Sequence, residues 1–71
     1  MSKEVRTLSV NGMSCEHCVK AVNGAVGQLN GVDSVSVDLK SKKVIVEFDP
    51  QKVTTVQIKD AIEDQGYDVM E

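Results

Sequence analysis

The stretch VSVDLKSKKVIVEF, residues 35–48, contains two runs in which apolar and polar side chains alternate, joined by a short polar link. Alternation with a period of two places every second side chain on the same face, so each run predicts a strand with one buried face. The link, which turns at Ser41 and Lys42, is too short for a crossover between parallel strands. The stretch therefore predicts an antiparallel hairpin of strands over residues 35–39 and 43–48.

Upstream of the hairpin, the sequence predicts another strand and then a helix. Residues 4–10 alternate and place Leu8 and Val10 on one face of a strand. After a loop, apolar residues spaced three, four and three positions apart predict an amphipathic helix, and Asn30-Gly31 predicts its left-handed end. The buried stripe of this helix consists of Val19, Val22, Val26 and Leu29, widened by Ala25.

Downstream of the hairpin, the sequence predicts a second helix. Thr54 and Gln57 have the spacing of a capping box, in which two side chains bond to backbone groups at the start of a helix. Val53 and Ile58 have the spacing of a hydrophobic staple around the same cap. Gly66 is expected to end the helix. The buried stripe consists of Ile58, Ala61 and Ile62.

The last strand completes the fold prediction. Residues 67–70 predict a short edge strand in which Tyr67 and Val69 share a face, so the element order is β-α-β-β-α-β. Both βαβ crossovers should be right-handed, which places two helices on one face of a four-stranded antiparallel sheet. We therefore predict an α+β fold, the ferredoxin-like βαββαβ sandwich, as a single domain over residues 1–71. In this fold the loop after the first strand lies beside the loop that leads into the last strand.

The composition limits the classes of function. With 41% hydrophobic and 27% charged residues, the 71-residue chain has the composition of a soluble globular domain. A net charge of −3 and only two aromatic residues, Phe48 and Tyr67, argue against a nucleic-acid partner. The longest apolar run is residues 44–46, so no membrane insertion is expected, and residues 1–5 lack the apolar stretch of a secretory signal. We therefore expect a cytoplasmic protein whose cysteines stay reduced.

The end of the chain is acidic. From Asp60 onward it contains no lysine or arginine. The acidic residues there are Asp60, Glu63, Asp64, Asp68 and Glu71. Such a run is either a solvated helix face or a docking surface for a basic partner.

Both cysteines lie in GMSCEHC, residues 12–18, with two residues between them. On the predicted fold, Cys15 lies in the first loop and Cys18 in the first helical turn, with Ser14 as the expected N-cap. Backbone N–H groups and the helix dipole favour thiolate over thiol at this position. Because a thiolate is both a metal ligand and a redox nucleophile, the position alone does not select a function.

Three functions of the cysteine pair remain open. A structural disulfide would close a very small loop and is disfavoured in a reducing compartment. A dithiol oxidoreductase is indicated by CxxC near βαβ elements, but no tryptophan precedes Cys15 and no proline lies inside the pair. A soft-metal site suits copper(I), because two thiolates are too few for structural zinc or for an iron–sulfur cluster. Copper(I) held by two sulfurs can also pass to another dithiol by stepwise ligand exchange.

Two segments, LSVNGMSCEHC (residues 8–18) and AIEDQGYDV (residues 61–69), resemble the heavy-metal-associated domain family, and in particular bacterial copper chaperones of the CopZ type. The resemblance implies that Cys15 and Cys18 bind Cu(I) and that the protein is a carrier and not an enzyme. The implied partners are metal-binding domains of a copper-transporting P-type ATPase, a copper-responsive repressor, and a second copy of the chain bridged by copper. Carriage of mercury or zinc is the alternative, although Ser14, where zinc-selective relatives often have aspartate, favours copper.

Three further residues are expected close to the metal without being its main ligands. Met13 could supply a thioether, but its place at the end of the inward face of the first strand favours core packing. His17 lies between the cysteines, and its position in the helix predicts a side chain that points outward. Tyr67 is brought toward Cys18 by the predicted fold, either as an edge aromatic residue or as a residue beside the metal.

Overall fold

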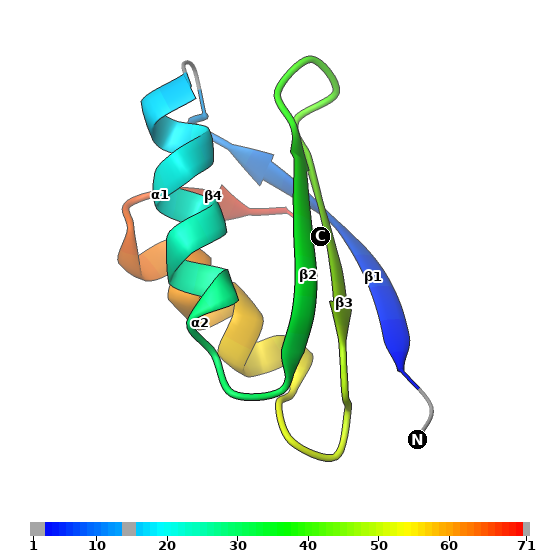
Figure 1. Cartoon of the computed structure of the whole chain (residues 1–71). Coiled ribbons are helices and arrows are strands. Elements are labelled where there is room, and N and C mark those ends of the chain that lie inside the picture. The colour runs from blue at the N-terminus through cyan, green and yellow to red at the C-terminus, as the bar shows by residue number, and fades with distance from the viewer. Residues whose placement is uncertain (1–2, 14–15, 71) are drawn as a thin grey trace.

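The computed structural model describes residues 3–13 and 16–70, and in these residues four strands and two helices follow one another in the predicted order. The elements are β1 (Glu4–Asn11), α1 (Glu16–Gly27), β2 (Val32–Asp38), β3 (Lys43–Phe48), α2 (Thr55–Asp64) and β4 (Asp68–Val69). The strands form a sheet in the order β2-β3-β1-β4, and its neighbouring strands are antiparallel. Both helices lie on one face of this sheet (Figure 1), which confirms the predicted ferredoxin-like sandwich.

The hairpin of β2 and β3 has the predicted antiparallel pairing, and its turn, residues 39–42, includes the predicted Ser41 and Lys42 but begins earlier. β2 begins earlier than predicted, at Val32, and a register shift follows directly. It ends at Asp38, whose carboxylate accepts hydrogen bonds from the backbone N–H groups of Lys40 at 3.1 Å and Ser41 at 3.4 Å. An aspartate that bonds to the backbone ahead of it starts a turn. Leu39 therefore lies in the turn and not in the strand.

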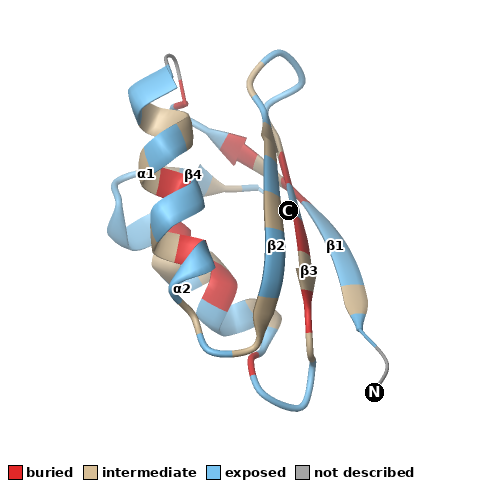
Figure 2. Ribbon diagram, in the orientation of Figure 1, coloured by how far each residue is buried: buried red, intermediate tan, exposed pale blue. Residues whose placement is uncertain are grey.

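The hydrophobic core lies between the sheet and the two helices (Figure 2). Its buried residues are Leu8, Val10, Met13, Val22, Val26, Val44, Val46, Phe48, Val53, Ile58 and Ile62. The buried strand residues occupy alternate positions of β1 and β3, as the period of two predicted. Val19 and Leu29, at the ends of the stripe predicted for the first helix, are half-buried.

α1 ends at Gly27, before the predicted end at Gly31. A backbone hydrogen bond from the N–H of Leu29 to the carbonyl of Val26, 3.1 Å long, forms the tighter turn that often follows a helix. Gly31 has the left-handed conformation that the sequence predicted, with φ of 107°. A Cβ at this position would lie 2.6 Å from the Cβ of Lys52, so the close approach of the two segments also requires glycine.

α2 begins with the predicted capping box. The backbone N–H of Gln57 donates to the Thr54 hydroxyl at 3.3 Å, and the Gln57 side-chain oxygen accepts from the Thr54 N–H at 2.9 Å. Val53 and Ile58, the predicted staple, are both buried in the core. The cap and the staple therefore fix where the chain enters the helix.

β4 is shorter than the strand predicted over residues 67–70. Only Asp68 and Val69 form strand, and they pair with Asn11 and Val10. This pairing extends β1 one residue beyond its predicted end. It also brings the segment before β4 next to the loop that follows β1.

Both helices are short. α1 has 12 residues and α2 has 10. A helix that crosses the hydrocarbon core of a membrane needs about 20. Within residues 3–13 and 16–70, neither helix has the length and apolar character for such a crossing.

Candidate metal site

The described residues of the cysteine motif, 12–13 and 16–18, lie where β1 ends and α1 begins, at one end of the sandwich (Figure 1). β1 ends at Asn11, and α1 begins at Glu16. Cys18 lies in the first turn of α1, as predicted. Ser14 and Cys15, the expected N-cap and the other expected ligand, lie outside the described residues, so their roles stay predictions.

Cys18 and its neighbours in α1 have different surroundings. Cys18 is half-buried and packs against the hydrophobic core. Glu16 and His17 are exposed, which is the outward orientation expected for His17. An acidic residue in the first turn, here Glu16, interacts favourably with the helix dipole. No contact tests whether His17 influences a bound metal.

Met13 packs in the core at the start of the motif. Only 4% of its surface is exposed, and it belongs to the same cluster as the buried residues of β1 and α1. The expected core packing is therefore observed. The flexible thioether side chain suits the irregular space below a loop.

Tyr67 lies against the backbone of Gly12 at the beginning of the same loop. Gly12 has φ of 99°, and a Cβ built on it would lie 3.3 Å from Cδ1 of Tyr67. Tyr67 itself is half-buried and packs against the core. The structure shows Tyr67 beside Gly12, and the predicted approach of Tyr67 to Cys18 stays a prediction. Gly12 was predicted only as part of the loop after the first strand, although glycine in a tight loop is itself a signal of close backbone approach.

The ion pairs of the described residues lie away from the motif. Lys3 bonds to the Asp33 carboxylate at 2.9 Å, and Arg6 bonds to Glu4 at 2.6 Å, all near the start of β1 or in β2. The hydrogen bond that Lys3 donates to the Asp33 carboxylate raises the pKa of Lys3 above its ordinary 10.5. Neither pair includes the acidic residues of α2, which are Asp60, Glu63 and Asp64.

The described part of the chain, which omits Cys15, contains no group of three or more His, Cys, Asp or Glu side chains that could hold a metal ion.

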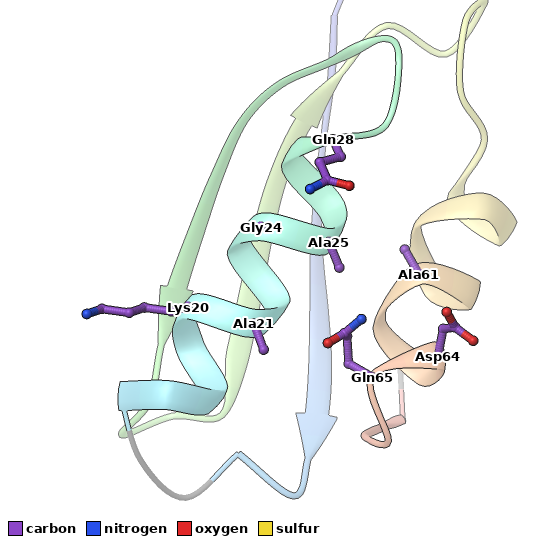
Figure 3. Close-up of a pocket in the computed structure, with 8 residues that line it drawn as sticks. All are labelled: Lys20, Ala21, Gly24, Ala25, Gln28, Ala61, Asp64 and Gln65. Carbon is purple, nitrogen blue, oxygen red and sulfur yellow. The ribbon is translucent and has the colours of Figure 1, made fainter.

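A groove of about 400 Å³ lies between α1 and α2 (Figure 3). Small residues of both helices line it, among them Ala21, Gly24, Ala25 and Ala61. The predicted metal-site residues within the described ranges, Met13, His17, Cys18 and Tyr67, do not line this groove.

Residues 7–68 match the family model of the heavy-metal-associated domain. Among curated proteins, the copper chaperone CopZ of Bacillus subtilis (strain 168) is 61% identical over 66 residues, which is 93% of this chain and 96% of that protein. The family match and this similarity both cover most of the chain.

Solved structures agree with the fold. A CopZ metallochaperone has a TM-score of 0.89 at 51% identity and covers 97% of this chain and 100% of its own. The water-soluble region of the P-type ATPase CopA from Bacillus subtilis has a TM-score of 0.91 at 29% identity, covering 96% of this chain and 45% of that chain. The same fold therefore occurs in a chaperone and within the soluble region of a transporter.

Proposed function

The chain belongs to the heavy-metal-associated domain family, and from that premise we propose that it is a copper chaperone, which binds Cu(I) and passes it to a partner protein. The observation that carries this proposal is the 61% identity to the copper chaperone CopZ over nearly the full length of both proteins. Cys15 and Cys18 are the proposed ligands. The position of Cys18 in the first turn of α1 supports this assignment, because a helix N-terminus stabilises a thiolate.

The chemistry of two thiolates suits Cu(I) as the cargo. Cu(I) is a soft ion that prefers sulfur, and two sulfurs are enough to hold it. Structural zinc takes four protein ligands, and the chain has two cysteines in all. The partly exposed Cys18 also leaves room for a thiol from another protein.

Transfer of the ion proceeds by ligand exchange without a change in its charge. A thiol of the partner loses its proton and binds Cu(I), which then has three sulfur ligands. Cys15 or Cys18 next leaves and takes up a proton, and a second exchange completes the transfer. No electron moves and no covalent bond of a substrate is broken, so the proposed protein is a carrier and not an enzyme.

The proposed partner is a metal-binding domain of a copper-transporting P-type ATPase. Its support is the shared fold with the soluble region of the ATPase CopA. Two further partners could take part in the same thiol exchange, because each would offer thiols to the ion. They are a copper-responsive repressor and a second copy of the chain bridged by copper. The carrier would act in the cytoplasm, where thiols stay reduced, with residues 1–71 as one domain.

Replacement of either cysteine tests the proposal. Cys15→Ser and Cys18→Ser should each abolish tight Cu(I) binding in competition with a chromogenic Cu(I) chelator, while circular dichroism shows a folded protein. Zn(II) titrated in parallel should bind more weakly than Cu(I). His17→Ala serves as the control, since an exposed neighbour should not be needed as a ligand. Undiminished Cu(I) affinity in both serine variants, or catalytic reduction of a disulfide by the wild type, would contradict the proposal.

A further inference from the structure

The contact between Tyr67 and Gly12 joins the last strand to the start of the cysteine loop. β4 pairs with β1 in the register Val10↔Val69 and Asn11↔Asp68. Gly12 and Tyr67 occupy the next position of this register, one step beyond the last paired residues. The tyrosine therefore stands across from the glycine as a cross-strand neighbour.

Tyr67 can approach Gly12 this closely because glycine has no side chain. A Cβ at Gly12 would lie 3.3 Å from Cδ1 and 3.9 Å from the α-carbon of Tyr67, so the ring edge occupies the space beside the bare α-carbon. An aromatic ring that covers a glycine on the neighbouring strand is a known way to stabilise an edge position. The left-handed φ of Gly12, 99°, then turns the chain out of the sheet.

Both sides of the contact are tied to the core. Tyr67 is half-buried and packs against the hydrophobic cluster. Met13, the residue after Gly12, is a buried member of the same cluster. The loop thus begins with Gly12 beside the tyrosine ring and Met13 packed in the core, and only one residue separates Met13 from Cys15 in the sequence.

We propose that Tyr67 is a positioning residue for Cu(I) binding and that it acts through the backbone of Gly12. The ring fixes where the loop leaves the sheet, and this determines how readily the two cysteines adopt the arrangement that the ion requires. The proposal rests on the copper-chaperone function proposed above. It predicts that the ring edge matters because it touches Gly12, and that adding a side chain at Gly12 has the same effect as removing the ring.

The test compares Cu(I) affinity among variants of these two residues. Tyr67→Leu keeps an apolar side chain but removes the ring, and it should lower Cu(I) affinity about tenfold, the effect typical of residues that orient metal ligands. Tyr67→Phe keeps Cδ1 and should restore the affinity to within about twofold of the wild type. Gly12→Ala should lower the affinity as Tyr67→Leu does. Loss of affinity in Tyr67→Phe as large as in Tyr67→Leu would overturn the proposal, because the hydroxyl would then carry the effect.

A double-variant cycle separates a direct contact from two independent effects. In the Tyr67→Leu background, the ring edge is gone and only the backbone strain at a φ of 99° remains, so Gly12→Ala should cause a smaller further loss of Cu(I) affinity than it causes in the wild type. Additive losses would mean that the two residues act separately and would overturn the proposal.

Two controls distinguish positioning from general destabilisation. Gly31 has φ of 107°, and a Cβ at this position would lie 2.6 Å from the Cβ of Lys52, so Gly31→Ala reproduces the backbone strain and the close approach at a site that adjoins neither Tyr67 nor the loop. Thr54→Ala removes the cap of α2 and so lowers stability away from the motif. Both should lower the unfolding midpoint and leave Cu(I) affinity within about twofold of the wild type. Equal affinity losses in these controls would overturn the proposal.

The outcomes also separate this proposal from the one on which it rests. If the wild type binds Cu(I) no more tightly than the serine variants, the copper-chaperone function fails. If the wild type binds tightly and the serine variants do not, but the Gly12 and Tyr67 variants match the wild type, only the positioning role fails.

Discussion

At the scale of single residues, the motif has a buried side and an exposed side. Met13 is 4% exposed, whereas Glu16 and His17 are open to solvent. Cys18 lies between these extremes, half-buried against the core. Packing limits the rotamers of a side chain, so Cys18 has little conformational entropy to lose when it binds an ion, yet part of its surface stays accessible to a partner thiol.

The burial of Met13 leads to a prediction about its role. Met13→Leu conserves volume and should change the free energy of unfolding by less than about 1.5 kcal/mol, with unchanged Cu(I) affinity. Met13→Ala should instead lower stability by about 2–5 kcal/mol, because it leaves a cavity. Urea unfolding and chelator competition measure the two quantities. Met70→Ala is the matched control, since Met70 is 66% exposed and its truncation should have little effect. A large loss of Cu(I) affinity in a stable Met13→Leu protein would identify the thioether as a ligand.

At the scale of elements, two glycines lower the intrinsic helix propensity of α1. Gly24 and Gly27 lie in its second half, and both are exposed. A Cβ at either position would meet no atom within 4 Å, so no contact within the described part of the chain requires glycine there. The helix therefore depends on the packing of Val22 and Val26.

Gly24→Ala should stabilise the protein. Alanine has the higher helix propensity, and the unfolded chain loses less conformational entropy on folding, so the free energy of unfolding should rise by about 0.5–1 kcal/mol. The midpoint of urea denaturation measures the change. The same substitution at Gly66, where φ is 96°, should lower stability because alanine is strained there. A loss of stability in Gly24→Ala would mean that α1 needs the glycine for a reason that its contacts do not show.

At the scale of the whole molecule, charge is distributed unevenly over the fold. The net charge is −3, and the two ion pairs of the described residues lie near the start of β1 and on β2. The acidic side chains of α2 take no part in them. In the sandwich, α2 ends close to the segment before β4, which itself lies against the start of the cysteine loop. An acidic surface near the metal site can steer a basic partner toward it.

Copper transfer to a basic partner domain should therefore depend on salt and on Asp64. Raising the ionic strength should slow transfer, since exposed charges are screened. Asp64→Asn should slow it roughly 1.4-fold to fivefold at low salt, equivalent to the 0.2–1 kcal/mol of an exposed charge pair. Stopped-flow mixing of the loaded protein with the acceptor domain measures the rate. Asp33→Asn, which removes the same charge from β2, is the control and should have a smaller effect. Equal rates in all three proteins at low salt would exclude steering by α2.

The affinity of the folded protein for Cu(I) should also depend on pH. A thiol must lose its proton to bind the ion, so binding releases protons and the apparent Cu(I) affinity should fall as the pH is lowered. The decrease should reach about tenfold per pH unit for each thiol that is protonated in the copper-free protein. Chelator competition between pH 8 and pH 6, with about pH 7 as the reference condition, measures this slope. An affinity that is independent of pH would show that both thiols are already ionised without the metal.

Local patterns in the sequence were enough to predict much of the fold. Alternation predicted which faces of β1 and β3 are buried, and the spacing of Thr54 and Gln57 predicted the start of α2. The ends of elements were less predictable. β4 was expected to have four residues and has two, and α1 was expected to reach Asn30-Gly31 and ends at Gly27. These boundaries depend on pairing and packing between distant segments, which propensity does not contain.

The sequence by itself determined the order of the elements, the antiparallel hairpin, the cap of α2 and the CxxC motif at the start of a helix, because each depends on residues within a few positions of one another. Only the tertiary structure decided the contacts of Tyr67 with Gly12, which put the ring edge beside the bare α-carbon. Those contacts join residues from opposite ends of the chain. They exist because β4 pairs with the end of β1, and that pairing is a consequence of how the whole sandwich closes around its core.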